Sequence, residues 1–217
     1  MANRVKKKKW PTLAEIALIP ALEPAGEDRP ACRACGLYKV AETPFMKAKV
    51  PNDWTQKLII VGDQPSQLDD RSGGPAFIGP VGRIIRKLVA KAGYSRSDVV
   101  YTNAVRCRPS NDRKPSMKEI RCCRPLLLRT LSKLNPKRIL LAGGIALKSA
   151  FNDGAKGNVG KSRGRRIQLV GSEFHSFVTY HPASILHGAL NNQVRILEDL
   201  QRDTLPKLKY PKEELPW

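Results

Sequence analysis

Acidic residues are scarce in this chain of 217 residues, which has 19 Asp and Glu against 39 Lys and Arg and a formal net charge of +20. No apolar stretch approaches the roughly 20 residues that a membrane-spanning helix needs, which excludes an ordinary transmembrane protein. The opening is polar and lysine-rich and lacks the apolar segment of a secretory signal. We therefore expect a cytoplasmic protein, associated with the nucleoid, or located in the host cytoplasm if its source is a virus.

Cysteines number only five, and an odd number without an export signal argues against a disulfide framework. Cys32 and Cys35 form a C-x2-C pair, and Cys107, Cys122 and Cys123 follow far downstream. Four thiolates from two distant loops can bind zinc or an iron–sulfur cluster. The spacing alone decides neither between the two metals nor between Cys122 and Cys123 as the fourth ligand.

Positive charge is concentrated in three segments. The first nine residues carry five basic groups, segment 106–138 has eleven basic residues against two acidic ones, and segment 156–166 has five basic residues and no acidic one. Basic segments of this kind attract phosphate backbones, and the release of counterions supplies affinity. Each run by itself also fits a solvated face, but three together favour a polyanionic partner, nucleic acid rather than a membrane.

The pattern of apolar residues indicates alternating strands and helices. We expect buried strands at 57–62, 99–102, 138–142 and 177–180, and helices at 81–92, 116–134, 145–151 and 191–203, besides a short helical stretch at 13–19. This alternation predicts an α/β fold, a three-layer α/β/α sandwich with a central, mostly parallel four-stranded sheet. The expected organisation is a basic N-terminal tail (1–29), one domain (30–205) and a C-terminal tail (206–217).

Ligands of such folds bind at the carboxyl ends of the strands, where four short motifs stand. These motifs are GDQPS (62–66), GPAFIGPVG (74–82), TNAVRCRP (102–109) and HPASIL (181–186). In this order they resemble the uracil-DNA glycosylase superfamily, most closely family 4, its iron–sulfur branch, over about residues 30–203. The resemblance implies a monomeric enzyme of base excision repair that flips uracil out of double- or single-stranded DNA and hydrolyses its N-glycosidic bond.

The resemblance also implies a ligand set for a metal. Family 4 members carry an N-terminal C-x2-C pair and two cysteines that flank the Arg-Pro loop, and the 16-residue separation of Cys107 and Cys123 matches the second pair. It therefore assigns Cys32, Cys35, Cys107 and Cys123 to a structural [4Fe-4S] cluster, with zinc as the alternative. Cys122 is then a spare thiol.

Three residues acquire roles in the base pocket through the same resemblance. Because a base inside a duplex cannot be reached, such enzymes bind it flipped out. Phe77 is implied to stack on the base, Asn103 to pair with its edge, and His181 to stabilise negative charge on the departing base. Ile185 or Leu186 is implied to fill the space that the base leaves. Ordinary packing or strand-end capping also accounts for Phe77, Asn103 and Leu186 when each is considered alone.

The first motif departs from the family pattern Gly-Glu-Ala-Pro-Gly at three positions. Asp63, the expected catalytic carboxylate, is one methylene shorter than glutamate, and Gln64 and Ser66 replace small residues at positions that contact the substrate. A positioned carboxylate stabilises an oxocarbenium-like transition state and orients water, so shortening it affects rate more than binding. The alternative function is therefore a catalytically weak or inactive DNA-binding relative that acts as an accessory in replication or repair.

Overall fold

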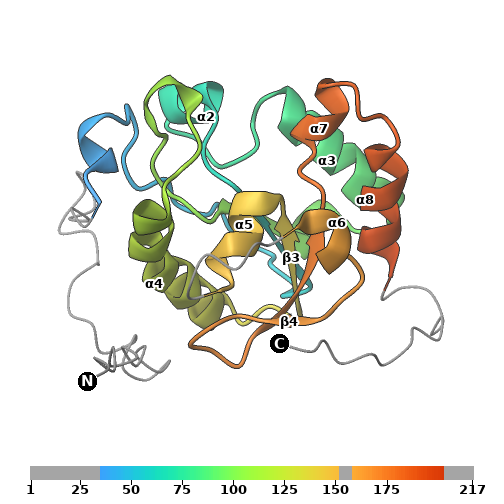
Figure 1. Ribbon diagram of the computed structural model, residues 1–217. Coiled ribbons are helices and arrows are strands. Elements are labelled where there is room, and N and C mark those ends of the chain that lie inside the picture. Colours follow the sequence, from blue (N-terminus) through green and yellow to red (C-terminus); the bar gives the residue numbers. More distant parts are fainter. Residues whose placement is uncertain (1–34, 152–157, 203–217) are drawn as a thin grey trace, which may run out of the picture.

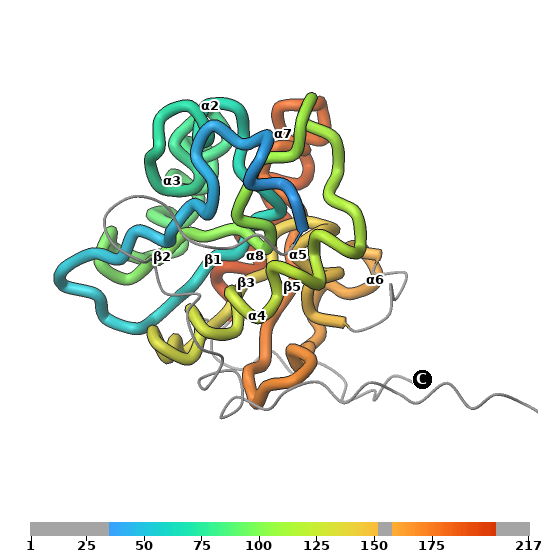
Figure 2. The backbone as a smooth tube through the Cα atoms, turned by 90° about the vertical axis from the view of Figure 1, so that its left-hand side faces the viewer, coloured from blue at the N-terminus to red at the C-terminus, as the bar shows by residue number. Residues whose placement is uncertain are grey.

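A central sheet organises the computed structural model, which describes residues 35–151 and 158–202. Five strands of the described part lie in the order β2-β1-β3-β5-β4. Figure 1 shows β3 and β4 among the helices, and Figure 2 shows β2, β1, β3 and β5 in that order. Their bounds are β1 (Leu58–Gly62), β2 (Val99–Asn103), β3 (Arg138–Ala142), β4 (Ile167–Gln168) and β5 (His175–Thr179). The pairs β1–β2, β1–β3 and β3–β5 are parallel, and β4 pairs antiparallel with β5. The mostly parallel sheet is confirmed, and the predicted strand count is short by the two-residue β4.

The helices include all four that the sequence predicts downstream of residue 35, namely α3 (Pro80–Lys91), α4 (Met117–Leu134), α5 (Gly144–Ser149) and α8 (Asn192–Gln201). Shorter helices are α2 (Gln67–Ser72), α6 (Val159–Ser162) and α7 (Ala183–Leu186), with 3-10 turns at Leu37–Lys39, Arg96–Asp98 and Ser110–Asp112. The helical stretch expected at 13–19 lies outside the described residues. In the described ranges, no helix has the length and apolar character that crossing a bilayer requires.

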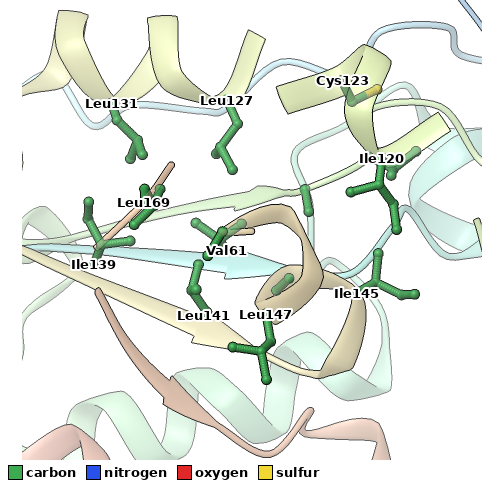
Figure 3. Packing of buried hydrophobic residues seen from close by; sticks show 14 of the residues in the cluster. Val61, Ile120, Cys123, Leu127, Leu131, Ile139, Leu141, Ile145, Leu147 and Leu169 are labelled. Carbon is green, nitrogen blue, oxygen red and sulfur yellow. The ribbon is translucent and has the colours of Figure 1, made fainter. Parts of the chain in front are cut away.

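Helices cover both faces of the sheet, which explains why every residue of β1 and β3 is buried. Alternate strand residues point to opposite faces, so Val61 and Leu141 pack with α4 and α5 (Figure 3). Ile60 and Leu140 pack on the other face with α3 and α8. The predicted three-layer α/β/α sandwich is therefore confirmed.

Helix α4 begins where the sequence pattern places it. The Ser116 hydroxyl accepts a hydrogen bond from the backbone N–H of Glu119 (3.3 Å), and the Glu119 carboxylate accepts one from the N–H of Ser116 (2.7 Å). This reciprocal capping box satisfies two backbone donors at the helix start. It fixes the point at which the chain leaves the loop after β2 and returns along the sheet.

The carboxyl ends of the parallel strands meet at one edge of the sheet. Gly62 and Asn103 are paired in register at the ends of β1 and β2. The backbone N–H of Gly143, just after β3, donates to the carbonyl of Thr179 at the end of β5 (3.0 Å). Helices α2 and α7 lie on this side of the molecule, as both views show (Figures 1 and 2). Residues from four strand ends are thus brought within reach of one another.

Candidate active site

Gly62 allows two of the predicted pocket residues to meet above the end of β1. A Cβ atom at this position would lie 2.4 Å from the ring carbon Cζ of Phe77 and 2.6 Å from Oδ1 of Asn103. Both distances are far below van der Waals contact, so any other residue would displace the ring or the amide. The glycine that ends the strand is therefore a condition for bringing Phe77 and Asn103 together.

The Phe77 ring forms one wall of this site. It lies 6.0 Å from the His181 ring at an interplanar angle of 24°, and 5.9 Å from the Tyr101 ring. Its backbone φ of +65° is uncommon for a bulky residue. A Cβ at Gly82 would lie 1.3 Å from the Phe77 carbonyl oxygen, so only glycine lets α3 approach that carbonyl so closely. Neighbouring elements hold Phe77 in this conformation, and its side chain, 5% exposed, is also part of the core cluster between β1 and α3.

The Asp63 carboxylate is fixed by backbone groups at the start of α5. Its Oδ1 accepts hydrogen bonds from the N–H groups of Ile145 (2.9 Å) and Ala146 (2.8 Å). A Cβ at Gly143 would lie 2.6 Å from the same oxygen. Burial raises the pKa of Asp63 from its usual value, while nearby His181 and the two N–H donors act in the opposite direction. The carboxylate thus has a fixed orientation next to the imidazole.

The His181 imidazole is oriented by a backbone donor on α7. The N–H of Ala183 donates to Nδ1 of His181 (3.2 Å). In the neutral ring one nitrogen accepts and the other carries the proton, so the proton is on Nε2. Burial lowers the pKa of His181, with Asp63 opposing that shift. The ring therefore presents a neutral Nε2–H donor.

The other two altered residues of the first motif form hydrogen bonds within the protein. The Gln64 side chain donates from Nε2 to the carbonyl of Arg113 (3.1 Å), which ties the motif to the loop before α4. Ser66 is the N-cap of α2, where its hydroxyl accepts from the N–H of Asp69 (3.2 Å). Ser66 thus positions the chain after the motif through its capping bond.

The two residues predicted to fill the vacated space differ in exposure. Ile185 is 9% exposed and packs in the core beside α3 and α8. Leu186, the last residue of α7, is 52% exposed. Only Leu186 of this pair has an exposed side chain.

Comparison with known proteins identifies the family of the chain. The model of the uracil DNA glycosylase superfamily matches residues 48–201, which include all four strand-end motifs. The chain belongs to this superfamily. Two of its curated relatives named "Type-4 uracil-DNA glycosylase" come from Pyrobaculum aerophilum (34% identical over 161 residues, 71% of this chain and 79% of the relative) and Thermotoga maritima (35% over 147 residues, 67% and 75%). A third, from Saccharolobus solfataricus, is 33% identical over 163 residues, 72% of this chain and 73% of the relative.

Three of the four cysteines assigned to the cluster by likeness to this superfamily lie in the described part of the chain. Cys35 and Cys123 are hydrogen-bonded through their side chains, which lowers the pKa of Cys35 to about 6 and raises that of Cys123. Cys107 interacts electrostatically with Cys123, and its sulfur accepts a hydrogen bond from the N–H of Phe45 (3.2 Å). Among the described residues, no group of three or more His, Cys, Asp or Glu side chains is arranged so that it could hold a metal ion. Cys32 lies outside the described residues.

The basic run at 106–138 is less available to DNA than its composition suggests. Arg106, Arg124 and Arg138 are buried. Arg106 donates to the carbonyl of Met46 (3.1 Å), and Arg124 donates to that of Ser149 (2.7 Å). These three side chains stabilise the domain from within. The prediction that the whole basic run forms one phosphate-binding surface is therefore wrong for these three residues.

Three contributions to the site were missed by reasoning from sequence. Tyr101 backs the Phe77 ring, Gly143 makes room for the Asp63 carboxylate, and the backbone of Ala183 orients His181. Backbone donors and ring contacts leave no signal in the sequence.

Proposed function

We propose that this superfamily member is a uracil-DNA glycosylase that acts in DNA repair by hydrolysing the N-glycosidic bond of a flipped-out uracil. The observation that carries the proposal is the assembly of Phe77, Asn103, Asp63 and His181 at the carboxyl ends of the strands. The relatives' shared name supports the same activity. A carboxylate, an amide and a neutral imidazole are all in place, so nothing supports the alternative of an inactive accessory.

Base recognition rests on Phe77 and Asn103. The Phe77 ring offers a flat apolar face on which a pyrimidine stacks. The Asn103 amide has a donor and an acceptor, which match the O4 and N3–H groups of uracil. Because the ring and the amide both lie close to Gly62, the base is read on its face and its edge together.

Bond cleavage rests on His181 and Asp63. As the bond between C1′ and N1 breaks, its electron pair leaves with the uracil, and the Nε2–H of His181 donates to the negative O2. The second Asp63 oxygen, Oδ2, orients the water whose oxygen bonds to C1′ and stabilises the positive sugar. The water loses a proton to solvent, and the departed uracil anion takes one up. Leu186 enters the space that the base has left.

A single-turnover assay tests this function. We expect the protein to release uracil from an oligonucleotide that contains one uracil. The abasic site that remains is then cleaved by alkali. The same oligonucleotide with thymine should stay intact. If the protein binds the uracil oligonucleotide and releases no base under these conditions, the proposed function is wrong and the accessory role replaces it.

We also propose that Cys32, Cys35, Cys107 and Cys123 hold a [4Fe-4S] cluster. The side-chain hydrogen bond between Cys35 and Cys123, and the electrostatic effect of Cys107 on Cys123, support a role for these three thiols as ligands. The cluster supplies a covalent tie between the segment at Cys35, the loop after β2 and helix α4. Its role is structural, because the residues that contact the base belong to other motifs.

Two neighbouring cysteines provide a matched test of the cluster. Cys123→Ser should lose bound iron and solubility because a ligand is removed, whereas Cys122→Ser should keep about four irons per chain, the content of one [4Fe-4S] centre. Iron analysis and the visible absorption of anaerobically purified protein measure both variants. Equal iron in the two variants would contradict the ligand assignment, and stoichiometric zinc without iron in the parent would identify zinc as the metal.

A further inference from the structure

A cavity of about 540 Å³ lies between α3 and β2, apart from the proposed catalytic residues. Strand β2 is at one end of the sheet order, so this flank is not covered by another strand of the sheet. Ala76 and Ile78, the neighbours of Phe77, line the cavity, whereas Asp63 and His181 do not. Its volume falls within the range of small-molecule sites. The cavity is thus a separate site that adjoins the wall of the base pocket.

All the charged residues that line this cavity are basic. Lys49, Arg86 and Arg96 contribute to its lining, and no acidic residue of the described chain does. Lys49 is held there by a backbone bridge to Tyr101. All three basic side chains are exposed, so an entering ligand does not have to displace them from the protein interior. Clustered cations without a carboxylate favour a phosphate group.

Two tyrosines add aromatic rings and hydroxyl groups to the lining of the cavity. The Arg86 guanidinium carbon lies 6.0 Å from the centre of the Tyr101 ring, whose other neighbour is the Phe77 ring. Burial raises the pKa of Tyr101 to about 12, so its hydroxyl stays protonated and can donate. The Tyr94 hydroxyl accepts a hydrogen bond from Arg138 (2.9 Å), which holds that side chain in place. Aromatic surface beside cations suits a base joined to a phosphate.

We propose that this cavity binds a nucleoside phosphate, either as a unit of a DNA strand or as a free nucleotide. Arg86 and Lys49 contact the phosphate, and Tyr101 contacts the nucleoside. The proposal does not depend on uracil excision, because the cavity contains none of the residues that act on the base. A ligand bound in this cavity would, however, lie against the segment that carries Phe77.

The test compares two basic residues of α3. Arg86 lines the cavity, whereas Lys87, equally exposed on the same helix, does not. Binding of a uracil-free single-stranded oligonucleotide and of thymidine monophosphate is measured on the full chain over a range of salt. Arg86→Ala should weaken oligonucleotide binding about tenfold and lower the salt slope by about one, and Lys87→Ala should change affinity less than about twofold.

The outcomes separate the two sources of the phosphate. Weaker oligonucleotide binding by Arg86→Ala, with no binding of the mononucleotide, assigns the cavity to the DNA strand. Loss of mononucleotide binding, with oligonucleotide binding unchanged, assigns it to a free nucleotide. If Arg86→Ala and Lys87→Ala behave alike with both probes, the cavity is not a nucleotide site. Thermal unfolding checks that both variants fold, and a parent that releases no uracil would leave this comparison unaffected.

Discussion

Replacing His181 with alanine should lower the single-turnover rate of uracil release by roughly 100- to 1000-fold, the effect of removing one oxyanion donor. The backbone N–H of Ala183 fixes the proton of the neutral ring on Nε2. In the proposed mechanism this proton is donated to the developing charge of the base. That charge exists mainly in the transition state. Affinity for uracil-containing DNA should therefore hardly change, because backbone contacts supply most of it.

His187 provides the control for this variant. It is an exposed histidine directly after α7, and it has no part in the proposed pocket. His187→Ala should release uracil at nearly the parental rate in the same assay. Equal losses in both variants, or a His181→Ala loss confined to DNA affinity, would contradict the role given to the Nε2–H group.

The sequence predicts the framework well because burial leaves a strong pattern. The strands at 57–62 and 138–142 contain the continuous apolar runs 58–61 and 139–142, which indicate a sheet covered on both faces. The capping pattern of Ser116 and Glu119 marks the start of α4 because both partners are close in sequence. Once the strands are parallel, the topology itself brings Asp63, Asn103 and His181 to one edge.

The fine geometry of the site has no comparable signal. Strand β4 consists of two residues, too few for a periodic pattern. The positive φ of Phe77 depends on tertiary contacts, including the close approach of Gly82. The burial of Arg106 and Arg124 runs against the usual exposure of arginine, and it becomes understandable only when their carbonyl partners are seen.

The shortened carboxylate of the first motif is compensated by its surroundings. Asp63 differs from the family's glutamate by one methylene, which by itself predicts a loss of rate rather than of binding. In the structure two N–H groups of α5 fix Oδ1, and Gly143 allows the approach. In the proposed mechanism Oδ2 serves the water and the sugar. We therefore expect catalysis to depend on a glycine outside the motif that carries the carboxylate.

Gly143→Ala should lower the rate of uracil release by about 100-fold, the effect expected when a catalytic group is displaced by about 1 Å. Its Cβ would lie 2.6 Å from Oδ1 of Asp63, so the carboxylate must move. The φ of +113° at this position adds backbone strain on the order of 1–3 kcal/mol. Single-turnover kinetics measure the rate, and thermal unfolding measures the strain.

Substitutions at two other glycines serve as controls. They distinguish the effect of displacing the carboxylate from the effects of backbone strain and of adding a methyl group. Gly144→Ala adds a methyl group one residue away, at the start of α5, where nothing lies within 4 Å, so its rate should match the parent. Gly93→Ala, at a φ of +87° and also without neighbours within 4 Å, imposes comparable strain far from Asp63. It should lower the unfolding temperature and preserve the rate. If Gly93→Ala also releases uracil slowly, general destabilisation explains the Gly143 result. If only Gly143→Ala releases uracil slowly, the position of the Asp63 carboxylate determines the rate of the reaction.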